Sequence, residues 1–207
     1  MANEHNMLEI EAKLWVEDLA VVREQLEALG AVLARPRVFE RNVRYDDRTG
    51  TLAPQGMVLR LRQDDRVRLT YKAPGTATTA GLLTRFEAEV EVSDFDTMDL
   101  ILRQLGYRSF FTYEKYRTTY EFGGAEIVLD ELPYGQFIEI EGEADRIEAI
   151  ITALDLSLAV RFSSGYTDLF YRVRENLKLD FTDLTFANFA GITVPLKAFA
   201  RLPQQAA

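Results

Sequence analysis

The stretch Leu8-Glu9-Ile10-Glu11-Ala12-Lys13-Leu14 alternates apolar and charged residues without interruption. A period of two predicts a β-strand that places its apolar side chains on one face and its charged side chains on the other. The charged face of such a strand usually meets water. The same spacing of charges recurs in later strands, so the direction of this face has to be decided for all of them together.

Seven further strands are expected along the chain, and most of them carry charges at alternate positions. Helices are expected after Asp18 and after Asp94, because each aspartate can cap an amphipathic stretch that ends at a glycine. Two more amphipathic helices follow the last strand, whereas residues 73–81 show no periodicity and predict a mobile loop. The expected strands are 38–46, 57–63, 66–72, 84–92, 110–122, 126–132 and 136–141, and the last two helices are 144–154 and 166–177.

The two halves of this pattern resemble each other. Glu9-Ile-Glu-Ala-Lys is followed by a helix and Leu29-Gly30, and Glu87-Ala-Glu-Val-Glu is followed by a helix and Leu105-Gly106. Each half would contribute four strands and one helix. The sequence therefore indicates a duplicated half-barrel with approximate two-fold symmetry.

Charged residues in these strands decide which way the faces point. If the charged side chains pointed outward, the apolar faces would fill the interior of a barrel, and the amphipathic helices would have no apolar surface to cover. If they point inward, the helices can bury the apolar outer surface. The sequence therefore predicts an α+β fold, an eight-stranded antiparallel β-barrel with a charged interior and helices packed outside. The acidic residues are Glu9, Glu11, Glu87, Glu89, Asp130, Glu139 and Glu141; the basic residues are Lys13, Arg60, Arg62, Arg68, Lys72, Arg85, Lys115 and Arg117.

Composition argues against several classes of function. The chain has no cysteine, which removes disulfides, thiolate nucleophiles and cysteine-bound zinc, and its one histidine is His5. A formal net charge of −9 argues against nucleic-acid binding, which needs a basic surface. No apolar run approaches the roughly 20 residues that cross a bilayer, and the first residues do not resemble a secretory signal. We therefore expect a cytoplasmic protein with no membrane partner.

An interior with many charges needs a ligand, because buried ions must be paired or coordinated. Carboxylates from several strands can converge on a hard divalent cation, Mg²⁺ or Mn²⁺. Seven or eight lysine and arginine side chains in one channel favour a polyanion larger than a single phosphate, and a triphosphate fits that demand. For any one strand, the alternative is a set of ordinary surface ion pairs.

Several stretches match an ordered set of motifs. Glu9-Ile10-Glu11-Ala12-Lys13 has the form ExExK, and the matches extend from about Met7 to Leu169. This set resembles the CYTH family, the triphosphate tunnel metalloenzymes that include class IV adenylate cyclases and thiamine triphosphatases. ExExK alone is a weak signal, whereas the ordered set is specific. The other stretches are Leu59–Arg62, Leu69–Gly75, Glu87–Glu89, Glu114–Arg117, Leu129–Asp130, Gly135–Glu141 and Tyr166–Leu169.

The resemblance implies roles for individual residues. Two positions depart from the family pattern: Asn42 stands where many members have Asp, which would weaken a second metal site, and Ser164-Gly165 replaces a basic residue and Ser. The implied catalytic residues are Glu11 and Glu89, either of which could orient the nucleophile, and Lys13. The implied metal ligands are Glu9, Glu11 and Glu139, with Asp130 and Glu141 as further ligands. The implied triphosphate ligands are Lys13, Arg60, Arg62, Lys72, Lys115 and Arg117, with Arg85 and Arg68 as weaker matches.

The resemblance thus implies a divalent-metal-dependent enzyme that acts on a triphosphate such as ATP, thiamine triphosphate or tripolyphosphate. In a triphosphatase the nucleophile is water, whereas in an adenylate cyclase it is the 3′-hydroxyl of ATP and pyrophosphate leaves. Hydrolysis and cyclisation stay open, because the tunnel residues serve both. A polyphosphate- or nucleotide-binding module without catalysis is the alternative from another class.

Residues 1–178 are expected to form the tunnel domain, and residues 179–207 a phenylalanine-rich extension. This extension contains Phe181, Phe186 and Phe189 and is expected to pack on the domain. A homodimer contact or a cap over one end of the barrel are the alternatives for it.

Overall fold

The computed structural model describes residues 8–74 and 83–201. The first residues of each range are described by their backbone alone, and side chains are described from residue 10 and from residue 86 onward. His5 and most of the predicted 73–81 loop lie outside this part of the chain.

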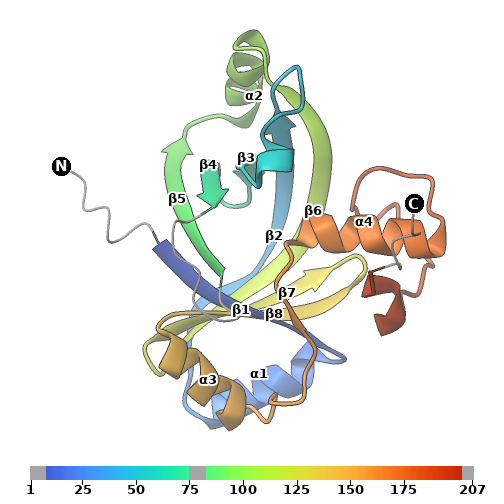
Figure 1. Cartoon of the computed structure of the whole chain (residues 1–207). Coiled ribbons are helices and arrows are strands. Elements are labelled where there is room, and N and C mark those ends of the chain that lie inside the picture. Colours follow the sequence, from blue (N-terminus) through green and yellow to red (C-terminus); the bar gives the residue numbers. More distant parts are fainter. Residues whose placement is uncertain (1–7, 75–82, 202–207) are drawn as a thin grey trace.

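Eight antiparallel strands form a barrel-like tunnel, as predicted (Figure 1). Their order is β5-β4-β3-β2-β6-β7-β8-β1, and β1 also pairs with β5 over Leu8–Glu11, which joins the two ends of the order. A short ninth strand, β9 (Arg161–Phe162), adds to β1. The eight strands are β1 Leu8–Val16, β2 Val32–Asp46, β3 Val58–Gln63, β4 Val67–Pro74, β5 Leu83–Val92, β6 Arg108–Phe122, β7 Ala125–Leu132 and β8 Gly135–Glu141.

Two of the four α-helices begin at the aspartate that the sequence predicts as their cap. The side chain of Asp18 accepts a hydrogen bond from the Ala20 amide at 2.8 Å, and that of Asp94 accepts one from the Thr97 amide at 2.7 Å. No helix in the described part of the chain has the length and apolar character that crossing a membrane requires. The helices are α1 Leu19–Ala28, α2 Phe95–Gln104, α3 Ala144–Ala153 and α4 Tyr166–Leu177, with short 3₁₀ turns η2 Ala53–Gln55 and η3 Leu196–Phe199.

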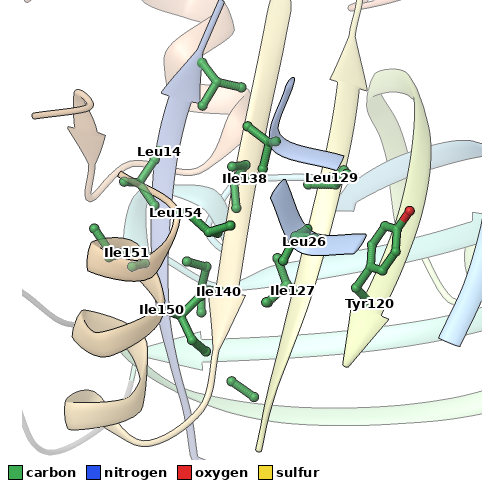
Figure 2. Close-up of a cluster of buried hydrophobic side chains, with 14 of the residues drawn as sticks. Leu14, Leu26, Tyr120, Ile127, Leu129, Ile138, Ile140, Ile150, Ile151 and Leu154 are labelled. Carbon is green, nitrogen blue, oxygen red and sulfur yellow. The ribbon is translucent and has the colours of Figure 1, made fainter. Parts of the chain in front are cut away.

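The apolar strand faces point outward and are covered by helices. Leu14, Ile138 and Ile140 lie under α1 and α3 in one buried cluster (Figure 2). Leu61 of β3 packs in a second cluster with Phe95 of α2. The charged residues of the same strands consequently face the tunnel, which is the arrangement predicted from the alternation.

The topology agrees with a duplicated half-barrel. The order strand–helix–strand–strand–strand occurs twice, in β1–β4 with α1 and in β5–β8 with α2. When each strand is exchanged for its counterpart in the other half, β1 for β5 through β4 for β8, the result is the same strand order read in the opposite direction. The approximate two-fold relation inferred from the charged motifs is therefore present in the strand connections.

One strand is longer than predicted. β2 begins at Val32 rather than at residue 38, and its pairing with β6 shifts register at Leu33/Arg35 and at Arg35/Val38. Pro36, which has no amide hydrogen, lies within the second shift. The register shifts break the alternation on which the prediction depended, so the first half of the strand was missed.

The inner face is apolar at one end of the tunnel. Phe137 shares the phase of Glu139 on β8, but it packs with α4 and the following segment in an aromatic cluster. Ring centroids of Phe137 lie 5.4 Å from Tyr166 and 5.8 Å from Phe199. The segment after α4 also bonds to the edge of β6, because the Leu184 amide donates to the Thr112 carbonyl at 2.9 Å. α4 and residues 179–199 thus pack together against this end.

Candidate active site

The strands enclose a cavity of about 400 Å³. Its wall consists mainly of charged side chains from the inner strand faces, completed by the start of α4. The side chains of Glu9 and Arg85 lie outside the described part of the structure, and Asp130 is fully buried without lining the cavity. The predicted site residues that line it are Glu11, Lys13, Arg60, Arg62, Lys72, Glu89, Lys115, Arg117, Glu139 and Glu141.

Three glutamates form an acidic row across neighbouring strands. Glu141 in β8 stands opposite Glu11 in β1 on one side and Glu126 in β7 on the other, and all three line the cavity. Burial and the charges of Glu126 and Glu11 raise the pKa of Glu141 to about 7, although Lys72 acts in the opposite direction. The acidic row is therefore an unfavourable concentration of negative charge.

A hard divalent cation fits the donor chemistry of the acidic row. The row offers only carboxylate oxygens, which Mg²⁺ and Mn²⁺ prefer, and a cation would relieve the repulsion at Glu141. Within the described residues alone, no three acidic or histidine side chains are arranged to ligate a metal. Glu11 and Glu141 would hold the cation together with Glu9, the predicted ligand whose side chain is not among the described ones.

Both oxygens of Glu139 have cationic partners. Lys13 Nζ lies 2.9 Å from Oε1, and Arg117 Nη2 lies 2.7 Å from Oε2. Burial alone would raise the pKa of Glu139, but Lys13 and Arg117 hold it well below its ordinary value. Lys13 also lies 3.6 Å from Glu11, so it connects this pair to the acidic row. Ligation of a metal by Glu139 would require it to exchange one of these partners, and this role stays a prediction.

Asp130 positions two of the cations that line the cavity. Its Oδ2 accepts from Lys115 Nζ at 2.9 Å, Arg117 Nη2 at 2.6 Å and the Tyr166 hydroxyl at 2.9 Å, and its Oδ1 accepts from Arg117 Nε at 2.8 Å. This buried group of four residues is called the Asp130 network below. The network fixes the cations before any ligand arrives; ligation of a metal by Asp130 stays a prediction.

The cations of β3 are held by neutral partners. Arg60 donates to the Tyr113 hydroxyl and to Thr70 Oγ1, both at 3.2 Å, and Arg62 Nε donates to Asn42 Oδ1 at 3.1 Å. Burial and the charge of Arg60 lower the pKa of Arg62 to about 10. The departure at Asn42 thus falls beside an arginine, on a different strand from the acidic row. Carboxylates lie near both arginines without a direct hydrogen bond to either, Glu89 at 3.8 Å from Arg60 and Glu40 at 3.6 Å from Arg62, so donors remain for an anionic ligand.

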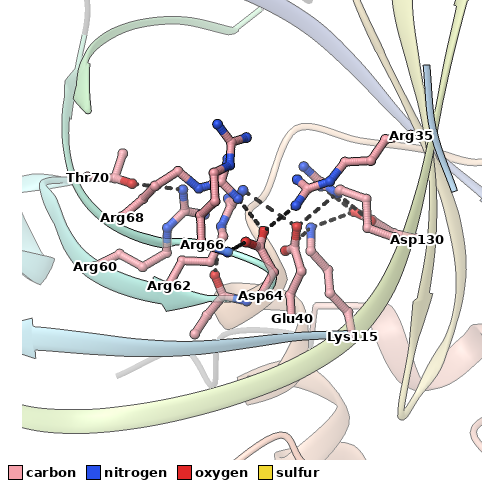
Figure 3. Close-up of polar contacts among 12 residues, drawn as sticks. Arg35, Glu40, Arg60, Arg62, Asp64, Arg66, Arg68, Thr70, Lys115 and Asp130 are labelled. Carbon is pink, nitrogen blue, oxygen red and sulfur yellow. Dashed lines mark hydrogen bonds and ion pairs between the residues drawn. The ribbon is translucent and has the colours of Figure 1, made fainter. Parts of the chain in front are cut away.

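Glu40 is a site residue that the sequence reasoning missed. It lies fully buried on β2, with carboxylate oxygens 3.6 Å from Arg62 and 3.6 Å from Lys115, and it accepts no hydrogen bond from the described residues (Figure 3). Burial would raise the pKa of Glu40, but Lys115 and Arg117 hold it well below the ordinary value. A signal was present in the sequence, because Glu40 shares the phase of Asn42 on a strand whose other face carries Phe39, Val43 and Tyr45.

Lys72 and Glu89 line the cavity from β4 and β5. Lys72 pairs with Glu87. Glu89 Oε2 accepts from Thr70 Oγ1 at 2.7 Å and lies 3.8 Å from Arg60. Glu89 therefore lies among the cations and away from the acidic row that contains Glu11. The catalytic roles of Glu11, Glu89 and Lys13 stay predictions.

Arg68, a weaker match to the motifs, lies outside the cavity lining. It pairs with Asp64 of the β3–β4 turn and lies 3.6 Å from Glu89 (Figure 3). The carboxylates of Asp64 and Glu89 thus balance the charge of Arg68 within the barrel wall.

Comparison with known proteins finds a match to the family model described as CYTH domain, over residues 7–167. A curated relative from Methanocaldococcus jannaschii, named "Putative adenylate cyclase MJ0240", is 27% identical over 175 residues, covering 79% of this chain and 98% of the relative.

Solved structures share the fold. A "putative adenylate cyclase" from Vibrio parahaemolyticus matches with a TM-score of 0.69 at 20% identity, covering 80% of this chain and 98% of the other. A "putative adenylyl cyclase" from Hippeastrum, described as having a dominant triphosphatase activity, matches with a TM-score of 0.60 at 18% identity, covering 79% and 95%. The tunnel fold is thus found in several proteins.

Proposed function

The chain belongs to the CYTH family, and from this premise we propose that it is a divalent-metal-dependent enzyme that cleaves the phosphate chain of a triphosphate. The observation that carries the proposal is the pairing of six cations with an acidic row around one cavity. A site for an anion alone would not need the acidic row. The six cations are Lys13, Arg60, Arg62, Lys72, Lys115 and Arg117.

The cations would bind the triphosphate oxygens and stabilise the charge that develops as a phosphoryl bond breaks. Arg60 and Arg62 suit this task because their hydrogen bonds go to neutral oxygens, which phosphate oxygens can replace, while the carboxylates of Glu89 and Glu40 lie farther away, at 3.8 and 3.6 Å. Arg117 and Lys115 are held in place by Asp130, so they lose little conformational freedom when a ligand binds.

A divalent cation bound at the acidic row would neutralise phosphate charge and polarise the phosphoryl group. The chain itself supplies two carboxylates that could orient an oxygen nucleophile, Glu11 on the acidic row and Glu89 beside Arg60. If the nucleophile is water, the enzyme is a triphosphatase; if it is a ribose hydroxyl, the enzyme is a cyclase. Relatives named adenylate cyclase and a relative with triphosphatase activity support both outcomes for this fold.

Turnover of ATP, thiamine triphosphate and tripolyphosphate tests the proposal. The wild-type protein is incubated with each compound and Mg²⁺ or Mn²⁺, and orthophosphate, pyrophosphate and cyclic nucleotide are resolved. Glu11→Gln should lose metal-dependent turnover and retain triphosphate binding, whereas Glu24→Gln, an exposed change on α1, should behave as wild type. Absence of turnover by the wild-type protein on all three compounds would refute the enzyme and leave a binding module.

A further inference from the structure

The cavity changes character at one mouth, where the connection before β3 meets the start of α4. Elsewhere its lining is mainly charged, whereas here apolar and aromatic residues gather around Arg44, Thr167 and Asp168. Phe110 is 37% exposed and Tyr171 is 42% exposed, so neither side chain is buried in the core. The apolar and aromatic residues of this mouth are Ala53, Met57, Val58, Phe110 and Tyr171.

Phe110 reaches this mouth because of an irregularity in the sheet. Arg44 of β2 pairs with Phe111 of β6, but Tyr45 pairs with Ser109, so Phe110 has no partner across the two strands. Phe111 points inward and is buried against Phe170, with ring centroids 5.4 Å apart. Strict alternation would then send Phe110 to the outer face, whereas the register shift lets it line the cavity.

Arg44 lies beside Phe110 with part of its hydrogen-bonding capacity unused. Its Cζ atom lies 5.6 Å from the centre of the Phe110 ring, and Nη1 donates to Thr167 Oγ1 at 3.0 Å. Nη2 donates to the Met57 carbonyl at 3.5 Å, and the buried Nε atom has no hydrogen-bond partner in the described part of the chain. Burial lowers the pKa of Arg44, whereas the Asp168 carboxylate at the same mouth acts against this effect and favours the charged form. A planar cation with a free donor suits a flat ring that carries acceptor atoms.

We propose that Phe110, Tyr171 and Arg44 form a subsite for the flat organic group of a nucleoside triphosphate, whose phosphates occupy the charged part of the cavity. The inference rests on the proposed function for the phosphate part. It goes beyond that function by assigning residues that select a triphosphate carrying an aromatic ring over inorganic tripolyphosphate. Single exposed aromatic residues are common, but here two line one cavity mouth, and a register shift directs one of them there.

Binding measured without metal separates this inference from catalysis. Dissociation constants for ATP and for tripolyphosphate are measured by calorimetry in EDTA, for the wild type, Phe110→Ala and Tyr171→Ala. Phe39→Ala is the matched control, because Phe39 is 40% exposed but does not line the cavity. Circular dichroism melting establishes that each variant is folded.

The wild type should bind ATP more tightly than tripolyphosphate. Phe110→Ala should weaken ATP binding by about 5- to 100-fold, as expected for loss of stacking on one base, and change tripolyphosphate binding by less than about twofold. Tyr171→Ala should act in the same direction, and Phe39→Ala should change neither constant.

Equal weakening of both ligands, or no change in ATP binding, would overturn the subsite. Tight binding of tripolyphosphate without a preference for ATP would overturn the subsite while leaving the proposed function intact. Binding of neither compound in EDTA would overturn the subsite, whereas the proposed function, which requires a divalent metal, is decided by the turnover assay.

Discussion

The acidic row and the Asp130 network lie on adjoining strands of the same tunnel, yet their carboxylates differ: Asp130 is fully buried, whereas Glu11 and Glu141 are half-buried and Glu126 is exposed. In the Asp130 network, Lys115, Arg117 and Tyr166 direct four hydrogen bonds to one carboxylate. In the acidic row, Glu141 faces two other glutamates across β1 and β7. The first arrangement is complete without a ligand, whereas the second gains from a cation.

This difference distinguishes carboxylates that hold other site residues in place from carboxylates that would bind a ligand. A carboxylate whose hydrogen bonds are all made by the protein contributes mainly to stability and to the position of its partners. A carboxylate that is buried among like charges lowers stability until a cation binds. Substitutions in the two groups should therefore change the free energy of unfolding in opposite directions.

The largest effect is expected at Asp130. Asp130→Asn removes the carboxylate that accepts hydrogen bonds from Lys115 and Arg117 and leaves these buried cations only Glu40 and Glu139 as negative partners. This should lower the free energy of unfolding by about 3–5 kcal/mol. Urea denaturation at pH 7 measures the loss. Glu131→Gln is the control, because Glu131 forms an exposed pair with Arg37 at 2.8 Å and its loss should cost less than about 1 kcal/mol. Equal effects of the two variants would contradict the distinction.

A change of opposite sign is expected at Glu141. Its pKa of about 7 in the folded protein lies above the ordinary 4.5. The folded protein therefore binds more protons than the unfolded chain between these values, and its stability falls as the pH rises through this window. Glu141→Gln should remove the penalty and stabilise the metal-free protein by about 1–2 kcal/mol at pH 8, after allowance for solvent screening.

Urea denaturation in EDTA at pH 4 and pH 8 checks this sign. The variant and the wild type should be equally stable at pH 4, where Glu141 is protonated in the folded protein and largely protonated in the unfolded chain. Millimolar Mg²⁺ should stabilise the wild type at pH 8 more than it stabilises the variant. A variant less stable than the wild type at pH 8 would show that Glu141 already has a compensating partner.

The smallest effect is expected at Tyr166. Tyr166→Phe removes the hydroxyl that donates to Asp130 at 2.9 Å, but Lys115 and Arg117 still satisfy the carboxylate. The expected loss is about 1 kcal/mol, measured by urea denaturation. Tyr171→Phe provides the comparison, because its partly exposed side chain has no hydrogen bond within the described residues; it should not change stability. A loss as large as that of Asp130→Asn would show that the hydroxyl is essential to the network.

Strand alternation was sufficient to predict the direction of the charged faces, because helices need an apolar surface to cover. The same rule correctly placed Lys13, Arg60 and Glu141 on the cavity wall. Alternation carries no information about partners across the barrel, so it could not reveal that Asp130 is saturated. It also fails at register shifts, which is why the first half of β2 was missed and why Phe110 lines the cavity unexpectedly.

The inner strand faces are not charged along their whole length. Phe137 lies in the charged phase of β8 but belongs to the aromatic cluster, because α4 and the segment after it cover that end of the inner face. The family model ends at residue 167, so most of this covering segment lies beyond it. The domain boundary at residue 178, homodimer formation and the roles of Glu9 and Arg85 stay predictions.

The position of β1 has a consequence for how the protein assembles. β1 is the first strand in the chain, but its partners are β5 and β8, which end at residues 92 and 141. Such pairings have a high contact order and form slowly. Glu11 and Glu141 meet only when β1 pairs with β8, so the acidic row and the closed ring arise in the same late step. During synthesis the edge of the first strand that pairs with β8 must therefore stay unpaired until the last strand of the ring has been made.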